Sequence, residues 1–241
     1  MSRGLYCGVF ALAAVSLAHG AGYAQDPLKL PGKNYTVAFE NSDVAVIRAH
    51  YGPHEKIPVH DHTSFSTVFV YLSDSGPVKI NHEEPGSTDA PVTRPPTVKG
   101  AYRVAPGIAE RHSIENLGDQ SSDFLRVELK HVSLTMKEPF RGKAPQNLSS
   151  DTDVVEFNNP AVQIERIVCV GTESCPVNTS DAPSLVVAFT SFVMTSQKTH
   201  RREMMEAGAV RWLPADQGMS VKAEGDGTAH LLRILLPSTK P

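Results

Sequence analysis

The stretch PVHDHTSFSTVFVY at residues 58–71 places a polar corner with two histidines in front of an apolar strand. The stretch PVNTSDAPSLVVAF at residues 176–189 repeats the same pattern at a constant offset. Further blocks recur in the same order. GAYRVAP at 100–106 corresponds to GAVRWLP at 208–214. Each copy then has a Gly-Asp pair followed by a strand-like block, FLRVEL at 124–129 and LLRILL at 231–236. Such an ordered set of blocks indicates a tandem duplication of one unit of about 100 residues.

Short apolar runs separated by turn-forming residues indicate that each unit consists of β-strands. The chain contains 18 Pro and 17 Gly along its length, and no long stretch keeps a helical period. This pattern is typical of a β-sandwich or barrel. In the first unit we expect strands at residues 44–51, 65–72, 78–81, 100–104, 111–115 and 123–131. Residues 83–97 contain four prolines and are expected to form a loop, because proline does not fit the interior of a sheet.

The composition is that of an ordinary globular chain. Of its 241 residues, 40% are apolar and 20% charged, which excludes disorder, collagen and coiled coil. Lys and Arg number 23 against 26 Asp and Glu, a net charge of -3. A protein that binds nucleic acid through its phosphates needs a basic excess, so we expect no nucleic-acid partner.

Residues 1–24, MSRGLYCGVFALAAVSLAHGAGYA, have the pattern of a secretory signal peptide. Arg3 precedes an apolar run, and small residues lead to a cleavage site after Ala24. The run is shorter than the roughly 20 residues that a membrane-spanning helix needs. We therefore expect an exported protein, periplasmic or extracellular, with no membrane contact after the signal is removed.

Cleavage after Ala24 leaves Cys169 and Cys175 as the remaining cysteines. In an oxidising compartment, a disulfide across this short loop is the favoured interpretation. The alternative is two unpaired cysteines on diverging strands. The pair lacks nearby Cys or His partners for a zinc site.

Two histidines of the first unit are placed to share one metal ion. His60 and His62 flank a single residue of an extended chain, so their imidazoles point to the same face, with α-carbons roughly 7 Å apart. A third imidazole has to come from another strand. His112, in the stretch PGIAERHSIEN at residues 106–116, is placed to supply it.

At these positions the sequence resembles the cupin superfamily. The first cupin motif contains a Gly, the pair His-x-His, a Glu and a second Gly; its matches here are Gly52, His60, His62 and Gly76. The second motif contains a Gly, a Pro, a Gly, a His and an Asn; its matches are Gly100, Pro106, Gly107, His112 and Asn116. Two spacings depart from the motifs: seven residues separate Gly52 from His60, and Gly107 follows Pro106 directly.

The resemblance covers residues 36–132 well and residues 153–237 weakly. It implies an all-β fold of two tandem cupin-type jelly-roll barrels. The N-terminal cupin domain, with the metal site, would span residues 25–137, a linker residues 138–152, and a degenerate second cupin domain residues 153–241. The second copy has Asn178, Ser180 and Ser220 at the histidine positions, so we expect no metal there and a role in packing against the first domain.

The most important departure is the missing carboxylate of the first motif. Its position falls on Ser66 or Thr67. Thr67 is favoured because its side chain lies on the same, inward-facing side of the strand as Phe69 and Tyr71. Three neutral imidazoles leave a divalent ion with its full charge. Ligation by imidazole alone suits copper, iron, nickel or zinc better than manganese or magnesium, which prefer oxygen ligands. We expect copper or iron, with zinc or nickel as alternatives.

Three further residues are weak candidates for catalysis: Glu110, Tyr71 and His54. Glu110 adjoins Arg111 and His112 and could enter the cavity as an acid or base, or could be a solvated charge at a strand end. Tyr71 lies on the same face of the strand as Thr67, and its side chain either contacts substrate or packs in the core. His54 could shuttle protons, or could be an exposed histidine.

Three functions follow from the cupin resemblance. The first is an exported metal-dependent oxidase or dioxygenase of a small organic or carbohydrate-derived compound. The second is a non-catalytic protein that binds a small acid or sugar, and the third is a metal-dependent decarboxylase or isomerase. The missing Glu weakens the third, because proton transfer commonly needs a carboxylate near the metal. Each implies a small-molecule ligand, and we expect a monomer or homodimer.

Overall fold

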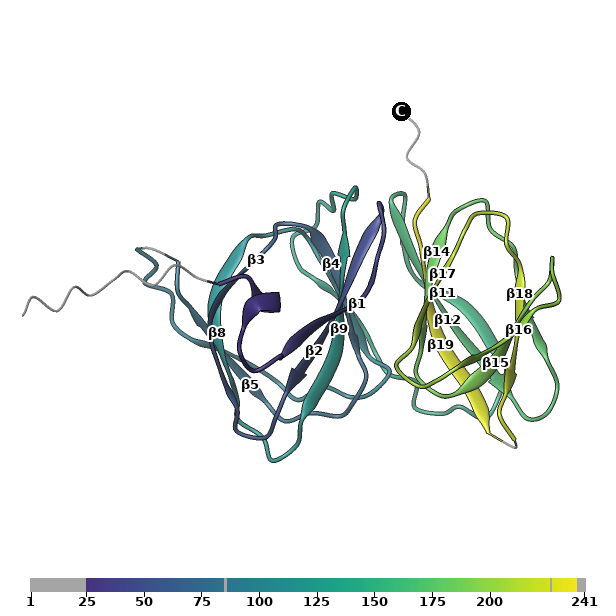
Figure 1. Ribbon diagram of the computed structural model, residues 1–241, viewed down its shortest axis with the longest axis horizontal. Helices are drawn as coiled ribbons and strands as arrows, with labels where there is room; N and C mark the ends of the chain where they lie inside the picture. The colour runs from purple at the N-terminus through teal and green to yellow at the C-terminus, as the bar shows by residue number, and fades with distance from the viewer. Residues whose placement is uncertain (1–24, 85, 226, 238–241) are drawn as a thin grey trace, which may run out of the picture.

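The computed structural model describes residues 25–84, 86–225 and 227–237, which form two β-barrels side by side (Figure 1). The predicted signal peptide, residues 1–24, lies outside the described residues. A helical turn, η1 (Pro27–Lys29), precedes the first strand. No helix in the described part of the chain is long and apolar enough to span a membrane.

The first barrel encloses its interior between two antiparallel sheets. The larger sheet has the order β1-β2-β9-β4-β7-β10, and the smaller has the order β3-β8-β5-β6. Their strands are β1 (Tyr35–Glu40), β2 (Val44–Tyr51), β3 (Lys56–His62), β4 (Ser66–Tyr71), β5 (Val78–His82), β6 (Val92–Arg94), β7 (Tyr102–Ala105), β8 (Glu110–Asn116), β9 (Ser122–Leu129) and β10 (Phe140–Gly142).

The second barrel repeats this strand order. Its sheets have the orders β11-β12-β19-β14-β17 and β13-β18-β15-β16, the arrangement of the first barrel without a counterpart of β10. The strands are β11 (Thr152–Asn159), β12 (Val162–Val170), β13 (Cys175–Val177), β14 (Ser184–Ala188), β15 (Phe192–Ser196), β16 (Arg202–Met205), β17 (Val210–Leu213), β18 (Met219–Ala223) and β19 (Thr228–Leu235). The prediction of two tandem jelly-roll barrels is therefore confirmed.

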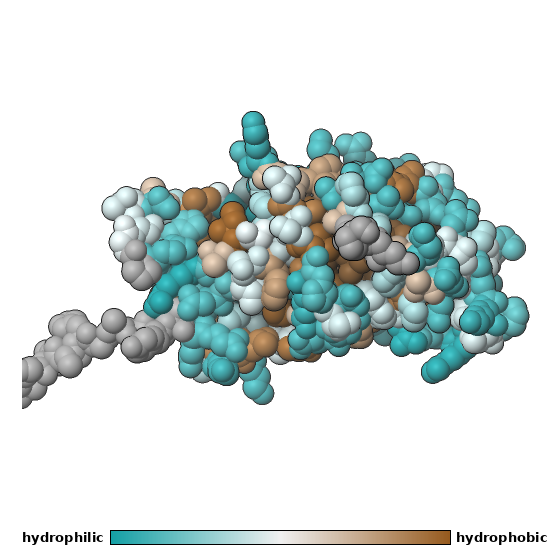
Figure 2. All heavy atoms as spheres, turned by 90° about the horizontal axis from the view of Figure 1, so that it is seen from above, coloured by the Kyte–Doolittle hydropathy of each residue, from teal (hydrophilic) through white to brown (hydrophobic). Residues whose placement is uncertain are grey.

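One apolar cluster joins the two barrels. It contains Val68 and Leu125 from the first barrel and Leu185 and Leu232 from the second, all fully buried. The larger sheets of the two barrels lie toward each other in the middle of the molecule (Figure 1). Figure 2 shows apolar side chains gathered around this middle region and hydrophilic side chains over both ends. Burial of apolar surface, at about 25 cal/mol per Å², therefore holds the barrels together.

Two segments differ from the sequence-based expectation. Residues 83–97, expected to be a loop, contain β6, which occupies the sheet edge beside β5, where neighbouring prolines are tolerated. Residues 138–152, expected to be a linker, contain β10, which pairs with β7. The prediction also omitted β1 and β3 as strands, although it took residues 60–62 as extended chain.

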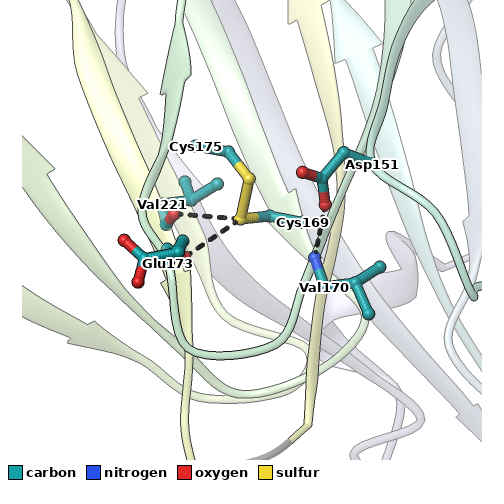
Figure 3. The surroundings of a disulfide bond; sticks show 6 residues. All are labelled: Asp151, Cys169, Val170, Glu173, Cys175 and Val221. Carbon is teal, nitrogen blue, oxygen red and sulfur yellow. Dashed lines mark hydrogen bonds between the residues drawn. A yellow bond between two sulfur atoms is a disulfide. The ribbon is translucent and has the colours of Figure 1, made fainter.

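The second barrel has an apolar interior and one disulfide. Its core cluster includes Phe192, Met194, Met219 and Val221. Cys169 and Cys175 form the predicted disulfide, with α-carbons 5.8 Å apart (Figure 3). The nearby Asp151 carboxylate accepts a hydrogen bond of 2.7 Å from the Val170 N–H, so it fixes the start of β11 against the end of β12.

Candidate metal centre

The three predicted histidines meet inside the first barrel, on the sheet farther from the second barrel. His60 on β3 pairs directly with His112 on β8. The register between β3 and β8 shifts between Ile57 and His60. This bulge resets the alternation of β3, because Ile57 and His60 are three positions apart and yet both are buried. His62 follows two residues later on the same inner face.

The geometry of the cluster is compact. The Nε2 atoms of His60 and His62 are 3.1 Å apart. The ring centroids of His60 lie 4.8 Å from those of both His62 and His112, and the remaining pair is 5.0 Å apart. One ligand atom from each histidine lies within 4.8 Å of the others, and all three residues are buried. Three ring nitrogens at such distances could hold one metal ion.

The hydrogen bonds of the cluster fit a metal. His60 Nδ1 donates to the Pro58 carbonyl at 2.8 Å, which leaves a lone pair on Nε2, facing the other rings. Such a bond from the other ring nitrogen commonly orients a metal-binding histidine. His62 Nδ1 and His112 Nδ1 are buried and have no hydrogen-bond partner among the described residues. The cluster therefore has more buried nitrogen atoms than its protein partners satisfy.

The imidazoles are held in the neutral form that metal ligation requires. Burial, supported by the charge of Arg126, lowers the pKa of His62 well below its ordinary value. Burial and the neighbouring His60 lower the pKa of His112 to about 2. Burial also lowers the pKa of His60, although its hydrogen bond to Pro58 opposes the shift. All three are therefore neutral at pH 7, and their lone pairs are free of competing protons.

Two tyrosines that the sequence analysis missed lie against the cluster. Tyr35 Oη is 3.0 Å from His60 Nε2 and 2.8 Å from Tyr51 Oη. Burial raises the pKa of Tyr35, and it raises the pKa of Tyr51 to about 12, so both hydroxyls keep their protons at neutral pH. Tyr35 lies on β1, a strand that the sequence pattern did not predict, and nothing in the sequence connects it with His60.

Buried charges lie beside the cluster. Arg126 Nε on β9 donates to Glu128 Oε1 at 2.9 Å, and Arg126 Nη1 lies 3.8 Å from Glu110 Oε2. Glu128 pairs directly with Thr67, the favoured of the two positions expected for the missing cupin carboxylate. The interior thus contains a carboxylate opposite that position, but Arg126 holds it in an ion pair. The sequence placed Glu128 on a strand and assigned it no role.

The cluster opens onto a cavity of about 540 Å³. Of the weak catalytic candidates, Glu110 and Tyr71 line this cavity, together with His62 and His112. His54 does not line it: it is an exposed turn residue whose Nε2 lies 2.8 Å from Asp119 Oδ1. Thr67 is buried, and its hydroxyl donates to the Phe65 carbonyl at 2.9 Å.

Two tandem jelly-roll barrels with three histidines at the cupin motif positions define a two-domain protein of cupin fold. AerE from Microcystis aeruginosa is similar at a TM-score of 0.60, with 12% identity over 84% of this chain and 91% of that chain. A salicylate 1,2-dioxygenase from Pseudaminobacter salicylatoxidans is similar at a TM-score of 0.51, with 12% identity over 80% of this chain and 70% of that one.

Oxalate decarboxylase from Bacillus subtilis, a protein with Mn(II) centres, is similar at a TM-score of 0.53, with 12% identity over 83% of this chain and 70% of that one. No family model and no curated protein matches the sequence. At these identities the similarity establishes the fold, and the chemistry has to be argued from the site.

Proposed function

We propose that this protein is an exported metal-dependent oxidoreductase, an oxidase or dioxygenase of a small organic or carbohydrate-derived compound. His60, His62 and His112 bind one divalent transition metal, copper or iron in preference to zinc or nickel. The observation that carries the proposal is a cluster of three neutral, buried imidazoles that faces a cavity of about 540 Å³. The protein acts as a monomer or homodimer.

The bound metal would supply Lewis acidity and, as copper or iron, electron transfer to oxygen. The chain's own residues bind and orient the substrate around it. Tyr35 and Tyr51 stay protonated, so the Tyr35 hydroxyl can donate a hydrogen bond to an oxygen atom held beside His60. The aromatic side chains of Tyr71 and Phe124 line the cavity and offer apolar surface to a substrate.

A metal-dependent decarboxylase or isomerase is the second candidate. Glu110 favours it, because this carboxylate lines the same cavity as His112 and lies at the start of the same strand. It could hold or deliver a proton at a bound substrate. The ion pair with Arg126 opposes this role, since the Glu110 carboxylate is already engaged by a guanidinium group.

Elemental analysis of protein purified from the exported fraction, without a His tag, tests the proposal. We expect about one copper or iron per chain, together with loss of the signal segment. Oxygen uptake is then measured with a panel of small aromatic, aliphatic and sugar acids. Oxygen uptake that depends on substrate supports an oxidase or dioxygenase. Carbon dioxide release without oxygen uptake supports the decarboxylase, and absence of a bound metal refutes both.

A further inference from the structure

A row of side chains crosses the cavity wall opposite the histidines. On the larger sheet, Arg141 of β10 pairs with Arg103 of β7, Arg103 pairs with Phe69 of β4, and Phe69 pairs with Arg126 of β9. Side chains of directly paired residues lie on the same face of a sheet. All four line the cavity. The row therefore places three arginines and one phenylalanine on the cavity wall.

The Phe69 ring lies next to the guanidinium groups of Arg103, Arg126 and Arg94. The Arg103 Cζ lies 4.2 Å from the Phe69 ring centroid, and the Arg126 Cζ lies 5.4 Å from it. Arg94, from the edge strand β6 of the opposite sheet, brings its Cζ to 6.0 Å from the same ring. Cation–π attraction of this kind offsets part of the repulsion between like charges. Arginines from three strands and two sheets thus meet at one place.

The charges in this row are not balanced. Arg126 forms ion pairs with Glu128 and Glu110, so these two carboxylates face the four arginines Arg94, Arg103, Arg126 and Arg141. The side chains of Arg94 and Arg103 take part in no hydrogen bond or ion pair among the residues that the structure describes. Arg103 is only 8% exposed, and its Nε is a buried donor without a partner. An unpaired buried charge is costly, so this guanidinium is placed to receive an anion.

Arg103 keeps its charge in this setting. Burial and the neighbouring Arg94 lower its pKa to about 10, which is still far above neutral pH. A divalent ion on three neutral histidines would add further positive charge on the other side of the cavity. Glu110 is the one carboxylate among the cavity-lining residues that the structure describes.

Much of the remaining cavity wall is apolar or aromatic. Tyr71, Phe124, Val78, Ile80 and Ile114 all line the cavity. A ligand that satisfies Arg103 therefore also has to cover apolar and aromatic surface. An inorganic anion would leave this surface in contact with water, whereas an acid with an apolar body would bury it.

We propose that the substrate is an organic carboxylate with an apolar body. Its carboxylate group is held by the guanidinium groups of Arg103 and Arg94, and its body lies against Tyr71 and Phe124 toward His62 and His112. This inference rests on the proposed function, since it names the substrate class of the same cavity, and it excludes a neutral sugar derivative. Arg103 and Arg94 are substrate-binding residues that select for the carboxylate.

Calorimetric titration of the protein with benzoate, benzamide and inorganic phosphate tests the substrate class. Benzoate and benzamide have the same ring and differ in charge, and phosphate has the charge without the ring. We expect benzoate to bind at least about tenfold more tightly than either, because a charge-assisted bond to a buried partner contributes more than a neutral one. Equal binding of benzamide would overturn the role of the arginines. Equal or tighter binding of phosphate would overturn the apolar body.

Variants identify the residues. Arg103→Gln should weaken benzoate binding at least about tenfold and leave benzamide binding within a factor of about two. Arg94→Gln, at a half-buried position, should show the same selective effect and serves as the second variant if Arg103→Gln does not fold. The matched control is Arg211→Gln, which removes a partly exposed arginine of the second barrel that pairs with Glu203. Unchanged benzoate binding in folded Arg103→Gln, or in Arg94→Gln, contradicts the assignment.

The titrations are made on metal-free and metal-loaded protein, so that the carboxylate site and the oxidoreductase function are tested independently of each other. Benzoate binding that persists without metal and is lost in Arg103→Gln supports the carboxylate site even if no oxygen uptake is found. Oxygen uptake with neutral substrates, combined with no preference for benzoate over benzamide, supports the oxidoreductase and refutes the carboxylate site.

Discussion

His230 provides a measurable link between pH and the stability of this protein. It lies on β19 at 4% exposure, and Arg166 Nη1 is 2.7 Å from its Nε2. Because a guanidinium only donates, His230 Nε2 accepts and the ring is neutral. Burial and the adjacent Arg166 charge lower the pKa of His230 from 6.5 to about 3. Protonation would place two positive charges against each other inside the protein.

The sign and size of the effect follow from these pKa values. Between pH 6.5 and about 3 the unfolded chain binds a proton at His230 that the folded chain does not, so stability falls as the pH falls. Lowering the pH from about 7.5 to about 5 should cost about 2 kcal/mol of unfolding free energy from this residue alone. Buried His60, His62 and His112 contribute further loss in metal-free protein, with the same sign.

Urea unfolding of metal-free wild type and His230→Gln, at these two pH values, isolates the contribution of His230. Glutamine offers an acceptor oxygen to Arg166 and does not titrate, and the three histidines of the cluster remain in both proteins. We expect the variant to lose about 2 kcal/mol less than wild type on acidification. At the higher pH the two should differ by less than about 1 kcal/mol, as a control for the retained hydrogen bond. Equal acid sensitivity would refute the argument that His230 is held neutral by burial and Arg166.

Three other perturbations have defined outcomes. Replacing His60, His62 or His112 with Ala should remove stoichiometric metal, whereas Asn178→Ala at the matching position of the second barrel should not change the metal content; undiminished metal in His112→Ala contradicts the ligand set. Thr67→Glu should shift metal preference from copper toward manganese or iron in competition experiments. Adding Glu128→Gln should relieve the repulsion between the two facing carboxylates. An unchanged metal preference in both the single and the double variant argues against the inward placement of Thr67. Replacing Cys169 and Cys175 with Ser should lower the unfolding free energy by about 2 kcal/mol, because the short disulfide loop restricts the unfolded chain; urea unfolding with no change would contradict this.

The sequence predicted most strands of the first barrel and the three histidines, because alternation along one strand decides which side chains share a face. His60 and His62 point inward on that argument alone, and the disulfide followed from a short loop and an expected oxidising environment. The bulge between Ile57 and His60 could not be predicted, since it depends on the register with β8.

The parts that were missed come from pairings between distant segments. Tyr35 reaches His60 only because β1 completes the larger sheet, and Arg141 meets Arg103 only because β10 pairs with β7. Each residue is unremarkable in its own stretch of sequence. The set of residues that line the cavity therefore depends on strand order and register, which local sequence patterns do not predict.

The apolar cluster shared by the two barrels also sets an order of events in folding. The first barrel is complete in sequence at β10, but the apolar cluster that contains Val68 and Leu125 is complete only when the second barrel, up to Leu232 of β19, has been added. At about 5 to 20 residues per second, synthesis of the intervening chain of about 100 residues takes about 5 to 20 seconds. During that interval the N-terminal half exposes a sheet face prone to self-association.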